Sequence, residues 1–307
     1  MEMKGLKIKL GILLYLDMKL VFRKFAFCGL LLVTLLFSCR EELYFEDAYC
    51  LENVNVVDPL DGLLEGMNVV VKGNKIFRIG KQEDLRMSRK NNIIDGSNRF
   101  LIPGLWDSHV HFYFDRELAL HMPELFLSSG ITSVRDTGGA FLYVDSIRQN
   151  SLNHPKTYPR IKIAGPLIDG YFNVYNGSVL PELSIRTRTV SESVAETERL
   201  VAQGVDFLKA YEMLSPKQFE AIAAIAAREN LRLAGHVPLS MKITHAISLG
   251  LNSLEHIKNL ELEAVKNSDS MLLQRRKMLL NKSSLSGREL RGNIHRAQKQ
   301  FAVDHLS

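Results

Sequence analysis

Hydrophobic positions follow three different patterns along the chain. In residues 50–102, short β-rich runs alternate with turn dipeptides such as Gly73-Asn74 and Asp95-Gly96, which is typical of antiparallel hairpins. In residues 103–260, apolar runs of five to seven residues alternate with helical patterns. This alternation predicts βαβ units around a parallel sheet. Residues 261–307 have an amphipathic helical pattern in which we identify no strand candidate.

The region of alternation contains six strand candidates, which we expect to lie in parallel. One helical pattern between them begins at Ser215, a candidate N-cap followed by Pro216 at the first helical position. Another pattern pairs Ser193 with Glu196 as a capping box. The six candidates are residues 105–111, 131–136, 160–165, 205–211, 231–236 and 252–256.

The first 38 residues have the pattern of a secretory signal peptide. Basic residues within 19–24 precede Phe25–Phe37, a run of thirteen residues without charge. Such a run is short of the roughly 20 residues that span a bilayer. Residues 36–39 resemble a bacterial lipoprotein box, which implies lipidation at Cys39. We therefore expect a lipid-anchored protein of the bacterial cell envelope, facing the periplasm or on the outer surface. A buried cysteine after a membrane helix is the alternative, and Met18 is an alternative start.

The net charge of +5 lies at the two ends of the chain. Residues 39–260 contain 24 basic and 27 acidic residues. A nucleic-acid-binding protein concentrates positive charge on its folded body, so we exclude that class. Of the three cysteines, Cys28 lies within the predicted signal peptide, and no disulfide framework follows.

The candidate chemistry lies at the ends of the predicted strands. His109 and His111 are one residue apart on the first strand, so their side chains point to the same side. His236 and His256 end two further strands. In a parallel α/β barrel the carboxyl ends of the strands surround one opening, where active sites lie. We therefore expect the four histidines to converge on a divalent metal. A pair of surface histidines is the alternative for His109 and His111.

Lys209 lies on the inward face of the fourth predicted strand. An unpaired ammonium in such a place costs several kcal/mol, so this lysine must be neutral, paired or chemically modified. Asp206 and Glu212 lie on the opposite face of the strand and are poor partners. Tyr211, on the same face as Lys209, is a candidate substrate-binding hydroxyl or an aromatic lip of the site.

Other polar residues near these strands receive structural interpretations. Asp136 is expected to cap a turn or, alternatively, to orient a ligand. Asp107 and Ser108 precede the histidine pair and are interpreted as structural. The remaining histidines have no companions in the sequence and are treated as surface or helix residues: His121, His154, His245, His295 and His305.

Five segments together carry a family resemblance. They are PGLWDSHVH, GITSVRDTGG, VDFLKAY, LAGHV and LEH, and they occur in the order seen in the amidohydrolase superfamily. Over residues 50–260 the chain is most similar to imidazolonepropionase-like and prolidase-like hydrolases. The resemblance implies a (β/α)8 TIM-like barrel with a small flanking β-sandwich. It also implies hydrolysis of a C–N bond in a small molecule or dipeptide through a metal-activated hydroxide.

The resemblance assigns a role to each of five residues. His109 and His111 bind the first divalent ion, His236 and His256 bind the second, and Lys209, as a carbamate formed with CO2, bridges the two. A carbamate also resolves the charge problem of Lys209, because it replaces a buried cation with an oxygen ligand. Nitrogen-rich ligation suits zinc but admits other metals.

The sequence departs from the family pattern after His256. Residues 103–260 provide six of eight strands, whereas a complete barrel takes about 250 residues. The family's general base, an Asp at the end of the eighth strand, has no counterpart, so no catalytic residue is assigned. We therefore expect an incomplete barrel. Its predicted parts are 1–38 (signal peptide), 39–102 (β-sandwich part), 103–260 (six β/α units) and 261–307 (truncated helical insertion).

Three functions are therefore left open by the sequence. The first is a metal-dependent hydrolase of amide, peptide or cyclic amide bonds, impaired by the loss of two strands. The second is a non-catalytic truncated envelope lipoprotein that retains partial metal binding. The third is a phosphoester hydrolase, because the same metal pair serves that chemistry. Substrate, metal identity and oligomeric state are not assigned.

Overall fold

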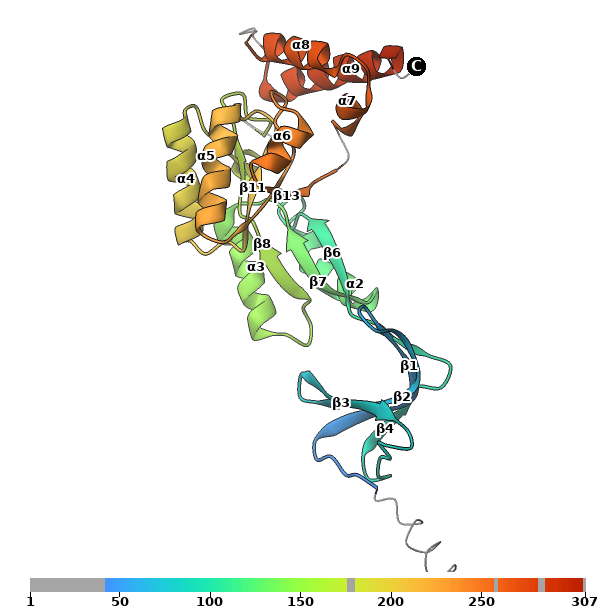
Figure 1. Cartoon of the computed structure of the whole chain (residues 1–307). Helices are drawn as coiled ribbons and strands as arrows, with labels where there is room; N and C mark the ends of the chain where they lie inside the picture. The colour runs from blue at the N-terminus through green and yellow to red at the C-terminus, as the bar shows by residue number, and fades with distance from the viewer. Residues whose placement is uncertain (1–41, 176–179, 257–258, 281–284, 306–307) are drawn as a thin grey trace, which may run out of the picture. The chain divides into compact units, whose positions relative to one another are not determined.

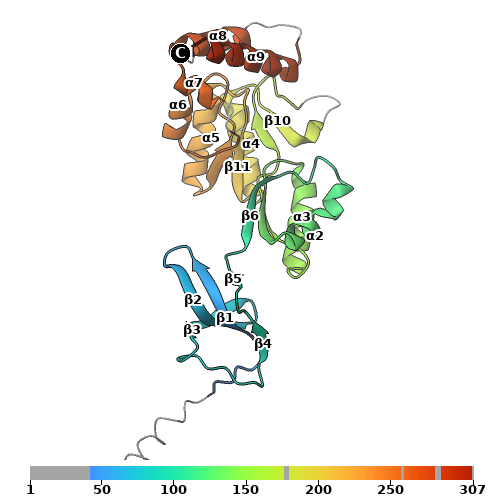
Figure 2. The ribbon, with the colours of Figure 1, turned by 90° about the vertical axis from the view of Figure 1, so that its right-hand side faces the viewer.

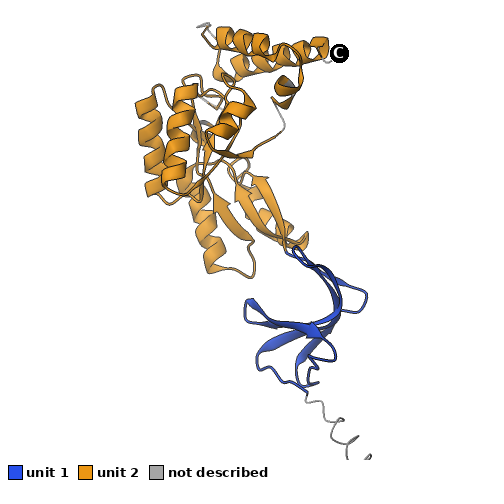
Figure 3. Ribbon diagram, in the orientation of Figure 1, with its two compact units in different colours: residues 1–103 blue, residues 104–307 orange. Residues whose placement is uncertain are grey.

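The computed structural model describes residues 42–175, 180–256, 259–280 and 285–305 (Figure 1). The predicted signal peptide and Cys39 lie outside the described residues. Within the described part of the chain, no helix is long and apolar enough to cross a membrane. The chain divides into two compact units, residues 1–103 and residues 104–307 (Figure 3).

The first unit is a five-stranded mixed sheet. Its first three strands form an antiparallel meander in the order β3-β2-β1, and the two others pair with β1 in parallel. Gly73, at φ +60°, allows the predicted hairpin turn between β2 and β3. The strands are β1 (Ala48–Asp58), β2 (Gly62–Lys72), β3 (Lys75–Lys81), β4 (Asn92–Asp95) and β5 (Phe100–Leu101).

The expectation of a purely antiparallel first unit is wrong. Residues 82–91 return the chain along the sheet, so that β4 starts at the same end as β1 and runs in the same direction. Cys50, on β1, is fully buried and packs with Val70, Leu85 and Met87. Its thiol is free, and burial raises its pKa.

The second unit is an α/β unit whose strand pairs are all parallel. One sheet has the order β6-β7-β8 and the other the order β10-β9-β11-β12-β13. The strands are β6 (Leu105–Val110), β7 (Ile131–Asp136), β8 (Arg160–Ile163), β9 (Leu167–Asp169), β10 (Ser184–Arg186), β11 (Phe207–Ala210), β12 (Arg232–Gly235) and β13 (Leu251–Leu254). The α/β class and all six predicted strands are therefore present.

Main-chain hydrogen bonds place β8 and β9 beside the two ends of β11. Asp206 N donates to Ile163 O at 2.9 Å, beside β8, and Tyr211 N donates to Ile168 O at 3.0 Å, on β9. Gly165, at φ +69°, lies between β8 and β9. These two short strands thus form one interrupted strand between β7 and β11. Because neighbouring strands are parallel, their carboxyl ends face one side of the unit.

Helices follow most of the strands, and α8 and α9 lie together at one end of the second unit (Figures 1 and 2). The helices are α2 (Met122–Ser128), α3 (Phe141–Asn153), α4 (Val190–Ala202), α5 (Pro216–Arg228), α6 (Ile243–Ser248), α7 (Leu260–Ala264), α8 (Ser268–Leu280) and α9 (Gly287–His305), with 3-10 turns at η1 (Leu118–Leu120) and η2 (Pro181–Leu183). The main core of the unit lies between β11 and β12 and helices α4 and α5, and includes Leu200, Leu208, Phe219, Ile222 and Leu233.

One of the two predicted caps is present. At α5, Ser215 Oγ accepts from Gln218 N at 3.3 Å and Ser215 N donates to Gln218 Oε1 at 3.0 Å, a capping box. The predicted capping box at Ser193 is wrong. Helix α4 begins about one turn earlier, because Thr189 Oγ1 accepts from Glu192 N at 3.1 Å and caps it there. Ser193 is buried inside the helix instead.

Replacing Gly235 with Ala is expected to destabilise the protein by about 3 kcal/mol, the upper part of the range for overpacked interiors. A Cβ at this position would lie 2.4 Å from the carbonyl oxygen of Ala210, so β11 and β12 would have to separate. Urea unfolding followed by circular dichroism measures the change. The control is Gly292→Ala on α9, where the nearest atom to a Cβ lies at 3.5 Å. It should stabilise by about 0.5–1 kcal/mol through helix propensity. Equal effects of the two changes would contradict the steric argument.

The pH dependence of stability should reflect Asp169, which is fully buried at the end of β9. It accepts from the main-chain N–H of Gly170, Val174 and Met213 at 2.8–2.9 Å, yet burial raises its pKa to about 7. Between about pH 4 and 7 the folded state then holds a proton that the unfolded state has released. The free energy of unfolding should therefore fall as pH rises, by up to roughly 1.4 kcal/mol per unit.

Asp169→Asn provides the control for this pH dependence, because an amide does not titrate. Unfolding curves between pH 4 and 8 should give a less negative slope for the variant than for the original chain. Asp136 is also fully buried with its pKa raised to about 7, so part of the slope should persist. Parallel curves for the two proteins would contradict the role of Asp169.

Candidate functional site

The structure brings the predicted site residues together in one cavity at the carboxyl ends of the strands. His109 lies on β6 and His111 directly after it, Lys209 lies on β11, and the others follow β11, β12 and β13. The cavity has a volume of about 220 Å³. It is lined by His109, His111, Phe114, Leu167, Tyr175, Lys209, Tyr211, His236 and His256.

The four imidazole rings form a continuous row. The ring centroids of His111 and His109 are 5.1 Å apart, those of His109 and His256 are 4.6 Å apart, and those of His256 and His236 are 5.2 Å apart. His256 has φ +62°, in the left-handed region that a side chain with a Cβ adopts at a cost. Strained backbone of this kind concentrates at functional sites.

Three of the histidines are held through Nδ1. His111 Nδ1 donates to Gly138 O at 2.9 Å. The Nδ1 atoms of His109 and His236 lie 2.5 Å from carboxylate oxygens of Glu255 and Glu212, respectively. An imidazole that donates through Nδ1 keeps the lone pair on Nε2, which is the form that binds a metal ion.

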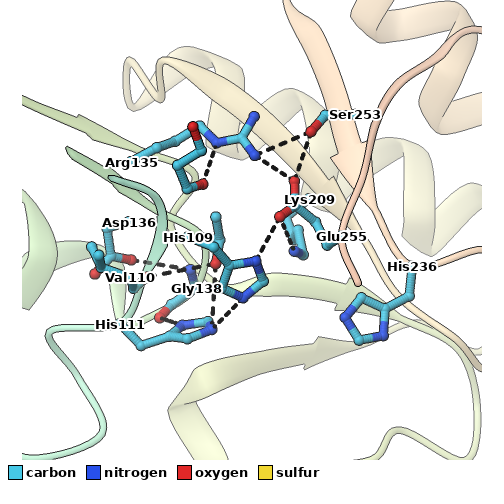
Figure 4. A network of polar contacts seen from close by, with 12 residues as sticks. His109, Val110, His111, Arg135, Asp136, Gly138, Lys209, His236, Ser253 and Glu255 are labelled. Carbon is cyan, nitrogen blue, oxygen red and sulfur yellow. Dashed lines mark hydrogen bonds and ion pairs between the residues drawn. The ribbon is translucent and has the colours of Figure 1, made fainter. Parts of the chain in front are cut away.

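The Nε2 atoms of His109 and His111 lie only 3.2 Å apart (Figure 4). When both rings donate through Nδ1, two lone pairs face each other at this distance, and a metal ion between them would relieve the repulsion. The Thr137 hydroxyl also lies 3.3 Å from His111 Nε2. Burial lowers the pKa of His111 and of His236 to about 4, so both are neutral near pH 7. The donor set is therefore chemically suited to a divalent ion.

The side chains do not yet surround a common point. Within the described ranges, no three His, Cys, Asp or Glu side chains form a group that could hold a metal ion. The four rings nevertheless line one cavity of about 220 Å³.

Lys209 is buried, 1% exposed, beside the histidines. Its Nζ has no hydrogen-bond partner among the described atoms, and the nearest acidic oxygen, Glu255 Oε2, is 3.9 Å away. Burial lowers the pKa of this ammonium to about 7. Asp206 lies elsewhere, bonded to Arg148 and Lys162, so it is not a partner of Lys209.

Glu255 is a site residue that the sequence patterns do not predict. It is 5% exposed and also accepts from Arg135 Nη2 at 2.5 Å and Ser253 Oγ at 2.9 Å (Figure 4). Burial alone would raise its pKa, but the hydrogen bond from His109 and the charges of Lys209 and Arg135 lower it to about 2. The sequence feature that could have identified Glu255 is its position directly before His256, a predicted metal ligand.

A second missed group surrounds Glu212, which is fully buried. Besides His236, it contacts Arg291 and His295 of α9, so the treatment of His295 as a residue without companions is wrong. Burial alone would raise the pKa of Glu212, but the hydrogen bonds from His236, His295 and Arg291 hold it well below its usual range. These contacts join positions about 80 residues apart, for which the sequence carries no local signal.

The other candidates have the following positions. Asp136 caps a turn, since its carboxylate accepts from Phe112 N at 2.8 Å and Gly138 N at 3.0 Å. Asp107 Oδ1 accepts from His109 N at 3.1 Å, a structural role. Tyr211 is 4% exposed, and its ring centroid lies 4.4 Å from that of His236. Exposed positions outside the cavity are occupied by His121, His154 and His245.

Comparison with known proteins gives matches in sequence and in structure. No family model matches the chain. A dihydroorotase of Clostridioides difficile (strain 630) is 40% identical over 62 residues, which are 20% of this chain and 14% of that protein. A solved prolidase in complex with N-methylphosphonate-L-proline is 21% identical, with a TM-score of 0.61 over 74% of this chain and 64% of the other. A solved amidohydrolase is 18% identical, with a TM-score of 0.59 over 82% and 76%.

These matches confirm the resemblance to the amidohydrolase superfamily that the sequence motifs indicate. At 18–21% identity, the solved structures establish the α/β fold and no more. The matched segment covers only 14% of the dihydroorotase, and the chain spans less than two thirds of the prolidase.

Proposed function

We propose that this chain is a metal-dependent hydrolase of C–N bonds in amides, peptides or cyclic amides. The observation that supports it best is the single cavity shared by four histidines and Lys209, with three of the histidines held through Nδ1. The solved prolidase with a related fold makes dipeptides the first substrate class to test.

In this proposal His109 and His111 hold one divalent ion, and His236 and His256 hold a second. Lys209 joins the two as a carbamate. The lowered pKa of Lys209, about 7, supports this role, because only a neutral amine reacts with CO2. Zinc is the first candidate because the ligands are rich in nitrogen. When bound, such ions supply a nucleophile from water at neutral pH and polarise the scissile carbonyl.

The protein's own residues position this chemistry. Glu255 and Glu212 hold the rings of His109 and His236, and the Tyr211 hydroxyl is our candidate for binding substrate. The cavity of about 220 Å³ restricts the substrate to a small molecule.

The barrel architecture of the second unit and the cellular location of the chain are also part of our proposal. We propose that the parallel strands of the second unit form part of a TIM-like barrel, supported by the interrupted strand that connects the two parallel sheets. The first unit would be part of a β-sandwich. Lipidation at Cys39 would anchor the chain in the bacterial cell envelope.

One observation favours a second candidate, a non-catalytic envelope lipoprotein with partial metal binding. Among the described residues, no three ligands are arranged to hold an ion. Zinc analysis of the purified chain, with a panel of dipeptides, cyclic amides and phosphotriesters, separates the candidates. The hydrolase proposal requires at least one equivalent of zinc and turnover of a C–N substrate. Zinc without turnover supports the second candidate, and turnover of phosphotriesters alone contradicts both.

A further inference from the structure

We infer that helix α9 positions His236 through Glu212, and so forms part of the candidate metal centre. This inference rests on the proposed function for the role of His236 as a ligand. It assigns a role to residues 287–305, a segment that the sequence patterns place outside the six β/α units. Arg291 and His295 are four residues apart and therefore lie on the same face of α9.

Both carboxylate oxygens of Glu212 have hydrogen-bond partners. Arg291 Nε donates to Oε2 at 2.7 Å and Arg291 Nη2 to Oε1 at 2.9 Å, a bidentate pair. His295 Nε2 donates to Oε2 at 2.8 Å. Oε1 also faces His236 Nδ1 at 2.5 Å. Glu212 is inaccessible to solvent, so its charge is balanced by these donors and not by water.

Helix α9 is itself fixed by packing next to the cavity. Leu290 and Ile294 are buried in one cluster with Tyr211, Met213 and Leu239. At the start of the helix, a Cβ at Gly287 would lie 1.9 Å from the carbonyl oxygen of Phe172, so the helix approaches this loop as closely as a glycine allows. The packing holds the donor face of α9 toward Glu212.

The consequence concerns the imidazole of His236. With both oxygens of Glu212 held in place, one oxygen is aimed at Nδ1 and the Nε2 lone pair is directed to the cavity. Without the donors from α9 the carboxylate can rotate, and the imidazole can exchange its tautomer. Loss of a residue that orients a metal ligand typically weakens metal binding roughly 10–100-fold.

The test compares zinc affinity in four full-length chains by competition with a chelator. They are the original chain, Arg291→Met, Arg291→Lys and the control Arg288→Met, an exposed position one turn earlier on the same helix. We expect zinc affinity to fall roughly 10–100-fold in Arg291→Met and to remain unchanged in Arg288→Met. Arg291→Lys should fall between them, because lysine keeps the charge but cannot donate as a bidentate fork.

A second readout uses the metal-free proteins. Long-range 1H–15N spectra of histidine-labelled protein should show a pure Nδ1–H tautomer for His236 in the original chain and in Arg288→Met. Arg291→Met should show a mixture, with an unchanged circular dichroism spectrum. A change confined to overall stability would not produce this signature.

The possible outcomes are distinct. The inference is overturned when Arg291→Met keeps both the original zinc affinity and the pure His236 tautomer. When the original chain binds no zinc, the proposed function fails, and the tautomer spectra alone decide whether α9 positions His236.

Discussion

Replacing Lys209 with Met is expected to abolish zinc loading and hydrolysis while leaving the metal-free fold at least as stable. The Lys209 Nζ is buried without a hydrogen-bond partner among the described atoms, so the ammonium opposes folding. Burying a charged group without a hydrogen bond costs free energy, and methionine removes that cost at the same position. The loss of activity should exceed the roughly 100-fold typical of residues that only orient a ligand.

Urea unfolding and zinc analysis of the same preparations measure these two opposite effects. Lys217→Met, at an exposed position of α5, is the control and should change neither quantity. A Lys209→Met protein that is less stable and still loads zinc would refute the assignment, because Lys209 would then be a structural cation.

Replacing Glu255 with Gln should have the second largest effect, on stability and metal affinity together. The carboxylate pairs with Arg135 and faces His109 Nδ1, both at 2.5 Å. Breaking a buried ion pair leaves an uncompensated charge and costs about 3 kcal/mol. The ring of His109 also loses its charged acceptor, so zinc affinity should fall by roughly 10–100-fold.

The pH dependence of the unfolding free energy separates the effect of the charge of Glu255 from the effect of its packing. Its pKa is lowered to about 2, so its contribution to stability is complete above pH 4.5 and is lost as pH falls towards 2. The difference in unfolding free energy between the original chain and Glu255→Gln should therefore shrink on acidification. Glu220→Gln, at an exposed position on α5, should show no such trend. A difference that is constant from pH 7 to pH 3 would count against the ion pair.

The convergence of the candidate site could be predicted because it depends on local patterns. Each parallel strand is an apolar run, and the histidines at 109, 111, 236 and 256 lie at strand ends. Parallel pairing then brings these ends to one edge of the sheet. Lys209 was identified because a lone cation on a buried strand face is energetically unusual.

The groups that orient the site could not be predicted in the same way. The contact between Glu212 and Arg291 joins the segment that follows β11 to a helical residue 79 positions away, and only tertiary packing creates it. Strands β9 and β10 are three residues long, too short to produce a period-two pattern. The start of α4 was misplaced because Thr189 and Ser193, one turn apart, both precede a Glu by three residues.

The buried thiol of Cys50 can be used to detect opening of the sheet in the first unit. A thiol reagent attacks the thiolate, and this side chain is both covered and held in the protonated form. In a chain that begins after Cys39, labelling would therefore proceed only through molecules in which β1 has separated from its neighbours. The labelling rate would therefore report how often that sheet opens.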